Sequence, residues 1–193
     1  MKNIIKLLDK CKVCGNQDLI KVLTLDEQYL SPTFVLSNKN NELAEIKTPL
    51  TLLLCDKNKN KNNCGLLQLK EITEPDYLYK EYFYRTATND TMRKDLRELV
   101  EQVLEISSPK SEDIVVDIGA NDCTMLNFYE EKFNLVGFEP ARNIKFVDNG
   151  KKIKLINNYF NSKNFKDIFA RKKAKVITSC AMFYDLENPV EFV

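Results

Sequence analysis

The cysteines of the first 64 residues form two arms, and each arm ends in a Cys-Gly pair. The first arm is CKVCG at residues 11–15, and the second runs from Cys55 to Cys64-Gly65. A glycine after the second cysteine lets the backbone turn sharply, so that both thiolates of an arm can face one ion. The sequence has no histidine, so the arms predict a closed tetrahedral zinc site whose ligands are Cys11, Cys14, Cys55 and Cys64.

The second arm is the longer one, since eight residues separate Cys55 from Cys64. Lengthening a flexible loop from two residues to eight costs about 1.2 kcal/mol in closure entropy. Structural zinc contributes about 10–16 kcal/mol to the folding of small peptides, so the longer arm does not exclude the site. A closed four-cysteine site leaves no ligand position for water, and we therefore expect a structural zinc. Free or redox-active thiols are the alternative.

The charge balance argues against two classes of partner. The 193 residues carry 29 basic and 28 acidic side chains, and this formal net charge of +1 offers no general attraction to nucleic acid or to a membrane surface. The lysine- and asparagine-rich run at 57–63 is expected to be a solvated loop rather than a phosphate-binding patch. No apolar run is long enough to span a bilayer, and the N-terminal apolar stretch is too short for a secretory signal. We therefore expect a cytoplasmic protein without nucleic-acid or membrane partners.

The hydrophobic pattern changes at Pro109. Before it, apolar spacing predicts a helix over 92–104 and short strands at 19–23, 32–36 and 50–54. After it, short apolar runs alternate with helical stretches, which is typical of a parallel α/β sheet. The expected strands are 114–118, 134–138, 154–157 and 175–179, and the expected helices are 124–132, 141–148 and 164–171.

A candidate cofactor site follows the first strand of this α/β part. Residues 117–122 read DIGAND and begin at the carboxyl end of that strand, where ligands bind in open parallel sheets. The dinucleotide fingerprint G-x-G-x-x-G is absent because Gly119 stands alone, which disfavours NAD. Glu139 ends the second strand, where a carboxylate can accept hydrogen bonds from both hydroxyls of a ribose. One tight glycine turn and a ribose-binding acid suit S-adenosylmethionine (SAM); an ordinary α/β turn with surface acids is the alternative.

Six stretches in one order carry a resemblance to a known family: CKVCG, LLLC…CGLLQL, YLYKEYFYRTATNDTMRKDL, VVDIGANDCTML, GFEPA and ITSCAMFYDLENP. The chain resembles the sugar C-methyltransferase family, in which an N-terminal zinc-binding domain precedes a SAM-dependent methyltransferase domain. The resemblance covers nearly the whole chain. It implies a small β-rich four-cysteine zinc lobe followed by the first half of a Rossmann-like methyltransferase domain. The implied domains are a zinc-binding domain at 1–75, an aromatic segment with a linking helix at 76–109, and a partial methyltransferase domain at 110–193.

The resemblance also implies roles for individual residues. The methionine end of SAM would be lined by Asp117, Gly119, Ala120 and Asn121, and the ribose would be held by Glu139. The adenine would lie near Asn158, Tyr159 and Phe160, and the cofactor would also be flanked by Ser179 and Cys180. Tyr84, or equally Tyr82, would face the nucleotide-sugar substrate. No catalytic residue is assigned.

The sequence departs from the family pattern after the first strand. Cys123 stands where the family usually has glycine, so we expect a crowded turn. Only four strands follow Pro109 where a SAM methyltransferase sheet usually has seven, and the family's histidine-bearing segment, which is thought to supply the base, lies beyond Val193. We therefore expect this chain to carry the zinc lobe and the first half of the SAM site, with a second chain or a missing C-terminal half completing the sheet.

The activity that the resemblance implies is methyl transfer from SAM to a carbon of a nucleotide-linked keto-sugar, as in deoxysugar biosynthesis. The alternative from another class is a non-catalytic, zinc-stabilised binding or assembly module that lacks the catalytic half. A zinc-knuckle protein that binds nucleic acid is a third interpretation, and the neutral charge balance counts against it.

Overall fold

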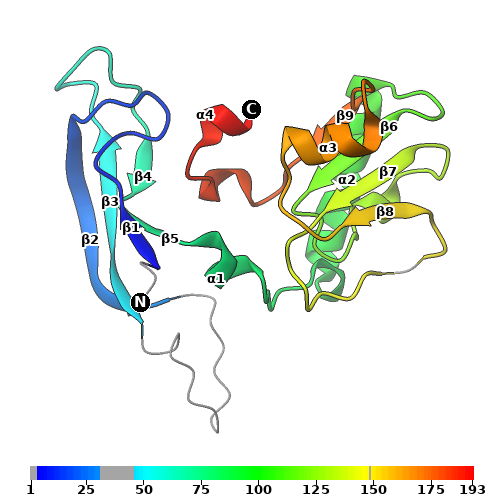
Figure 1. The fold of residues 1–193 in the computed structure, drawn as a ribbon, viewed down its shortest axis with the longest axis horizontal. Helices are drawn as coiled ribbons and strands as arrows, with labels where there is room; N and C mark the ends of the chain where they lie inside the picture. The colour runs from blue at the N-terminus through cyan, green and yellow to red at the C-terminus, as the bar shows by residue number, and fades with distance from the viewer. Residues whose placement is uncertain (1–3, 31–45, 148) are drawn as a thin grey trace, which may run out of the picture. The chain divides into compact units, whose positions relative to one another are not determined.

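The computed structural model describes residues 4–30, 46–147 and 149–193 (Figure 1). Contacts divide the chain into two compact units, one formed by residues 1–79 with 185–193 and the other by Lys80–Tyr184. The domain boundaries expected from the sequence stay a prediction. The strand expected at 32–36 lies outside the described residues.

The first unit is built from short antiparallel strands. Its larger sheet has the order β2-β3-β4, with β2 at Leu19–Tyr29, β3 at Lys47–Cys55 and β4 at Leu67–Leu69. A second pair joins β1 (Ile5–Leu7) to β5 (Glu71–Thr73), and the helices are α1 (Pro75–Tyr79) and α4 (Pro189–Phe192). The strands expected at 19–23 and 50–54 are therefore present. The buried Glu71 carboxylate accepts a hydrogen bond from the Thr51 amide at 2.8 Å, which ties β5 to β3.

The second unit contains a four-stranded parallel sheet of order β8-β7-β6-β9. Its strands are β6 (Ile114–Ile118), β7 (Asn134–Phe138), β8 (Ile153–Ile156) and β9 (Val176–Thr178). The expected parallel α/β sheet is thus confirmed. β6 lies between two neighbouring strands and is buried along its whole length. The chain steps from β6 to β7 to β8 and then returns to the other side of β6, so the strand order reverses between β6 and β9.

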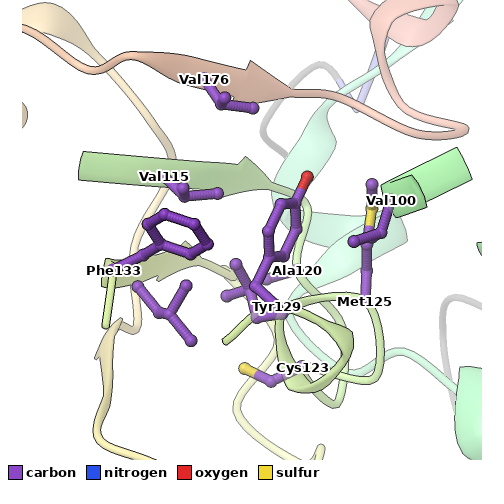
Figure 2. Packing of buried hydrophobic residues seen from close by; sticks show 10 residues of the cluster. Val100, Val115, Ala120, Cys123, Met125, Tyr129, Phe133 and Val176 are labelled. Atoms are coloured by element: carbon purple, nitrogen blue, oxygen red, sulfur yellow. The ribbon is translucent and has the colours of Figure 1, made fainter. Parts of the chain in front are cut away.

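Two helices accompany this sheet. α2 (Asp90–Ser107) begins after Asn89, whose side chain accepts a hydrogen bond from the Met92 amide, and ends at Ser108 in the left-handed conformation. α3 (Ser162–Phe169) connects β8 to β9. Figure 1 shows α2 behind the sheet and α3, the crossover helix from β8 to β9, in front of it. Figure 2 shows the core beneath α2, where Val100 packs with sheet and loop residues that include Val115, Tyr129 and Val176.

The prediction of a helix at 124–132 is wrong. The structure has only a 3-10 turn at Leu126–Phe128. Cys123 before it has φ 63°, outside the helical region, and Tyr129 after it is extended and fully buried. The ammonium of Lys151 donates to the carbonyls of Asn127 and Tyr129 at 2.7 and 2.6 Å, which replaces the donors that a continuing helix would have supplied.

The helix expected at 141–148 is also wrong, since the described residues of this range, 141–147, form no helix. Their backbone groups bond to other segments. The Asn157 side-chain amide donates to the carbonyl of Ala141 at 2.8 Å, and the Val147 amide donates to the carbonyl of Asp122 at 2.9 Å. The apolar spacing here therefore reflects packing at the end of the sheet rather than a helical turn.

The helix expected at 164–171 corresponds to α3 with a shift of two residues, because Asn161 accepts from the Asn164 amide and starts the helix earlier. No helix among the described residues is both long and apolar enough to cross a membrane.

Candidate functional site

The four cysteines of the two arms meet in the first unit. Cys55 is the last residue of β3, and the other three lie in the turns that flank the sheet. Their sulfur atoms all lie within 4.8 Å of one another, with 3.4 Å between Cys11 and Cys64 and 3.5 Å between Cys14 and Cys55. Four sulfurs placed tetrahedrally around a zinc ion, each about 2.3 Å from it, would be about 3.8 Å apart. The donor set and its spacing therefore fit a four-cysteine zinc site.

Both arms have the same backbone geometry despite their different lengths. In each, the amide of the final glycine donates to the carbonyl of the first cysteine, from Gly15 to Cys11 at 2.9 Å and from Gly65 to Cys55 at 3.0 Å. The two glycines have φ 76° and 82°, which only glycine adopts without strain. The extra residues of the second arm therefore form a loop outside the turn and leave its geometry unchanged.

The polar loop inside the second arm is anchored at its end. Residues 57–62 are mostly exposed, as expected for a solvated loop, but Asn63 is buried. The Asn63 side-chain amide donates to the carbonyl of Asp56 at 2.7 Å, and its oxygen accepts from the Asn16 side chain at 2.8 Å. Asn63 therefore connects the second arm to the first, a structural role that the low-complexity sequence did not indicate.

The four thiols differ in their surroundings. The backbone N–H of Asn16 lowers the pKa of the exposed Cys14 thiol to about 6, whereas burial raises the pKa of Cys55 to about 12 and also raises that of Cys64. Metal binding requires thiolates. Burial disfavours the negatively charged thiolates, and a bound divalent cation would stabilise them. The cluster is therefore suited to a bound cation.

The candidate cofactor site lies in the second unit, where β6 and β7 end side by side. The amides of Gly119 and Ala120 both donate to the carbonyl of Phe138, the last residue of β7, at 2.9 and 3.0 Å. Gly119 has φ 75°, and a Cβ added there would lie 3.2 Å from Cγ of Met182. The positive φ therefore favours glycine at this turn, and a Cβ there would also require the Met182 side chain to shift by a few tenths of an ångström.

Glu139 holds this turn through its carboxylate. One oxygen accepts from the Asn121 amide at 2.7 Å and the other from the Ala141 amide at 2.8 Å, and the side chain is buried. Burial raises the pKa of Glu139, while the two backbone donors lower it. A carboxylate has about four lone-pair sites, so each oxygen can still accept one ribose hydroxyl. This acceptor capacity fits the ribose-binding role that the resemblance implies.

Asp117, near the carboxyl end of β6, is also buried. Its carboxylate accepts a hydrogen bond from the hydroxyl of Thr178 on β9 at 2.8 Å. Burial raises the pKa of Asp117 to about 7, against the opposing effect of Thr178. Sequence reasoning missed Thr178, because a threonine within a short strand gives no signal of its own.

The other expected cofactor residues also follow the carboxyl ends of strands. Ser179 and Cys180 follow β9, and burial raises the pKa of the Cys180 thiol. Asn158, Tyr159 and Phe160 follow β8, where the Phe160 ring stands edge-on to Phe138 at 5.0 Å between centroids. The structure therefore brings all the expected cofactor residues to one edge of the sheet, and their roles there stay a prediction.

Three buried hydroxyl groups in the second unit lack a hydrogen-bond partner within the described residues: Ser179, Tyr84 and Tyr129. Tyr129 was not expected to be functional. Figure 2 shows its ring among Ala120 and Met125, and its side chain is completely buried. Burial and the nearby Asp117 and Cys180 raise the pKa of its hydroxyl.

The substrate-side candidates Tyr82 and Tyr84 lie in the segment that leads into α2. The Asn143 side chain bonds the Tyr82 backbone in both directions, accepting from its amide at 2.9 Å and donating to its carbonyl at 3.0 Å. Asn121 donates from its side chain to the carbonyl of Tyr84 at 3.1 Å. The second unit therefore holds this segment beside the turn after β6.

Comparison with known proteins gives two findings. Residues 11–79 match the family model described as "Putative zinc binding domain". The chain is 27% identical over 172 residues to a protein of Streptomyces niveus named C-methyltransferase NovU, an alignment that covers 89% of this chain. The chain spans 39% of the length of that relative.

Both findings confirm the resemblance to the sugar C-methyltransferase family that the sequence suggested. The zinc-binding match begins at Cys11 and includes all four clustered cysteines, so it supports Zn²⁺ at the cluster independently of the distances.

Proposed function

We propose that this chain forms the zinc-binding lobe and the first half of the cofactor site of a SAM-dependent methyltransferase, and that the reaction is C-methylation of a nucleotide-linked keto-sugar. The likeness to a C-methyltransferase supports the reaction class. The observation that carries the cofactor assignment is the turn after β6, where Glu139 fixes the Asn121 amide and keeps acceptor sites for a ribose.

The strand order supports the place of the site. Ligands of open parallel sheets bind beyond the carboxyl ends of the strands, at the point where the strand order reverses. In this unit that point lies between β6 and β9, which end at Asp117-Ile118 and at Thr178. The expected methionine-end residues and the pair Ser179 and Cys180 flank it.

The chain's own residues would bind and orient the reactants. Bound SAM would supply an electrophilic methyl group for attack by an enolate carbon of the sugar. Glu139 would hold the ribose, Asp117 would face the methionine end, and the tight turn at Gly119 would let the backbone approach the cofactor. Tyr82 and Tyr84 stay candidates for the side that faces the nucleotide sugar.

Zinc would act in folding rather than in chemistry, since four cysteines occupy every tetrahedral position. A second chain or a C-terminal half that completes the sheet, and a cytoplasmic location, stay predictions.

Parallel calorimetric titrations with S-adenosylhomocysteine and with NAD test the cofactor. We expect binding of the first and none of the second. Glu139→Gln keeps an acceptor for a backbone amide but removes the charge, and a charged hydrogen bond contributes about 1.5–3 kcal/mol, so S-adenosylhomocysteine should bind about tenfold or more weakly. Glu101→Ala, an exposed change on α2, is the control. A chain that retains zinc and binds neither nucleotide would instead favour the non-catalytic module.

A further inference from the structure

The segment from Lys80 to Thr88, called here the aromatic segment, is attached to the second unit mainly by side chains that bond its backbone. At one end the Asn143 side chain bonds both backbone groups of Tyr82, and the Arg142 amide donates to the carbonyl of Lys80 at 2.9 Å. At the other end the partners are Asn121 and Asp122, which belong to the turn after β6. The segment therefore has two separate anchors, and only one of them is part of the candidate cofactor site.

The anchor in the cofactor turn uses both polar atoms of the Asn121 side chain. Its oxygen accepts from the Thr86 amide at 3.1 Å and from the Thr86 hydroxyl at 3.4 Å, and its nitrogen donates to the carbonyl of Tyr84 at 3.1 Å. The neighbouring Asp122 carboxylate accepts from the Ala87 amide at 2.8 Å. Asp122 and Thr86 are both buried, so these bonds are shielded from competing water.

The same residue is bonded to the ribose-binding acid. The Asn121 backbone amide donates to the Glu139 carboxylate at 2.7 Å. Asn121 has φ 50°, a conformation that asparagine tolerates better than most residues, and this conformation lets the backbone face Glu139 while the side chain reaches the aromatic segment. One residue thus joins the Glu139 carboxylate to the backbone of Tyr84 and Thr86.

We infer that Asn121 is a positioning residue that couples the cofactor site to the aromatic segment, so that an occupied cofactor site orders the segment carrying the substrate-side tyrosines. The inference rests on the proposed function, because it takes the turn after β6 as the cofactor site. A ligand that steadies the turn through Glu139 suppresses the local openings in which the Thr86 and Ala87 amides lose their partners. The coupling is reciprocal, so opening of the segment lowers the affinity for the ligand by the same factor by which the ligand suppresses that opening.

Amide hydrogen exchange of the whole chain, with and without saturating S-adenosylhomocysteine, tests this. In the unaltered chain we expect the ligand to slow exchange of the Thr86 and Ala87 amides several-fold. Asn121→Gly removes the side chain and keeps the positive φ. Exchange at Thr86 without ligand should therefore rise about 30-fold, because Thr86 loses both of its hydrogen bonds to Asn121. In this variant the ligand should no longer slow exchange at Thr86. The affinity for the ligand should fall by the same factor by which the ligand slows exchange at Thr86 in the unaltered chain.

Two further variants separate positioning from general loosening. Asn143→Ala removes an asparagine that bonds the same segment outside the cofactor turn; it should speed exchange at Tyr82 while ligand protection at Thr86 and the ligand affinity stay unchanged. Asn121→Asp keeps the acceptor for the Thr86 amide and loses the donor to Tyr84, so it should retain protection at Thr86 even if the glycine variant does not fold.

The outcomes distinguish the two proposals. If the unaltered chain binds S-adenosylhomocysteine but exchange at Thr86 and Ala87 does not change, the coupling is overturned and the cofactor assignment stands. If the unaltered chain does not bind the ligand, the proposed function is overturned and the coupling with it. Equal loss of ligand affinity in Asn121→Gly and Asn143→Ala would also overturn the special role of Asn121.

Discussion

Replacing Asp117 by asparagine should change how the stability of the second unit depends on pH. Asp117 is buried, and its pKa is raised from 3.8 to about 7 because burial disfavours the charged form. A raised pKa means that the folded state binds the proton more tightly than the unfolded state. The stability contributed by this group is therefore fully present below about pH 4 and is lost as the pH rises toward 7.

The magnitude follows from the shift of roughly three pKa units, each equivalent to about 1.4 kcal/mol, so the wild-type chain should lose about 4 kcal/mol through this group between about pH 4 and about pH 8. The asparagine side chain of Asp117→Asn would keep an oxygen that accepts from the Thr178 hydroxyl but could not ionise. The advantage of this variant over the wild type should therefore be about 4 kcal/mol larger at the higher pH than at the lower one. Any fixed cost of burying the amide cancels in this difference.

Urea unfolding followed by helical circular dichroism measures the difference, because the two long helices, α2 and α3, lie in the second unit. Loss of zinc at low pH affects both proteins equally. Asp95→Asn, an exposed change on α2, controls for the removal of one carboxylate. Parallel pH profiles for Asp117→Asn and the wild type would refute the argument that a buried, ionising Asp117 destabilises this unit.

Two other predictions concern the zinc site and the glycine turn. Protein purified without added metal should contain about one zinc per chain by elemental analysis. Cys55→Ser should abolish zinc binding and unfold the first unit, as followed by circular dichroism, because a small β-rich lobe has little other core. Absence of zinc, together with no effect of chelators on the circular dichroism, would contradict this. Gly119→Ala should destabilise the second unit by about 1–2 kcal/mol and weaken S-adenosylhomocysteine, because alanine is strained at φ 75° and its Cβ would contact Met182 at 3.2 Å; unchanged urea unfolding would argue against a required glycine.

The sequence predicted the strands better than the segments between them. β6 and β7 occupy the ranges that their apolar runs indicate, since a buried parallel strand needs a continuous apolar sequence. The two helices expected after them are absent, because side chains distant in sequence satisfy their backbone groups. Lys151 bonds the carbonyls of Asn127 and Tyr129, and Asn157 bonds that of Ala141. Such long-range bonds leave no periodic signal.

The candidate sites show the same limit. Cysteine spacing alone located the metal cluster, since four thiols in a chain without histidine leave few alternatives. Gly119 and Glu139 located the cofactor turn in the sequence. The role of the Asn121 side chain could not be predicted, because its partners are backbone atoms of Tyr84 and Thr86 that any residue could supply. Contacts between a side chain and a distant backbone require the fold.

The outer strand of the parallel sheet gives the last prediction. β9 pairs with β6 on one side, and no strand of the described residues pairs with its other side. Ile177 in the middle of β9 is 58% exposed. An open strand edge with an exposed apolar side chain is a template for association, and a lysine there blunts it. We expect the 193-residue polypeptide to self-associate in sedimentation and Ile177→Lys to shift it toward the monomer. Ile106→Lys is the matched control, because Ile106 is 85% exposed but belongs to the helix α2 and not to a strand. If both variants, or neither, changed the sedimentation, the open edge of β9 would not be the cause of association.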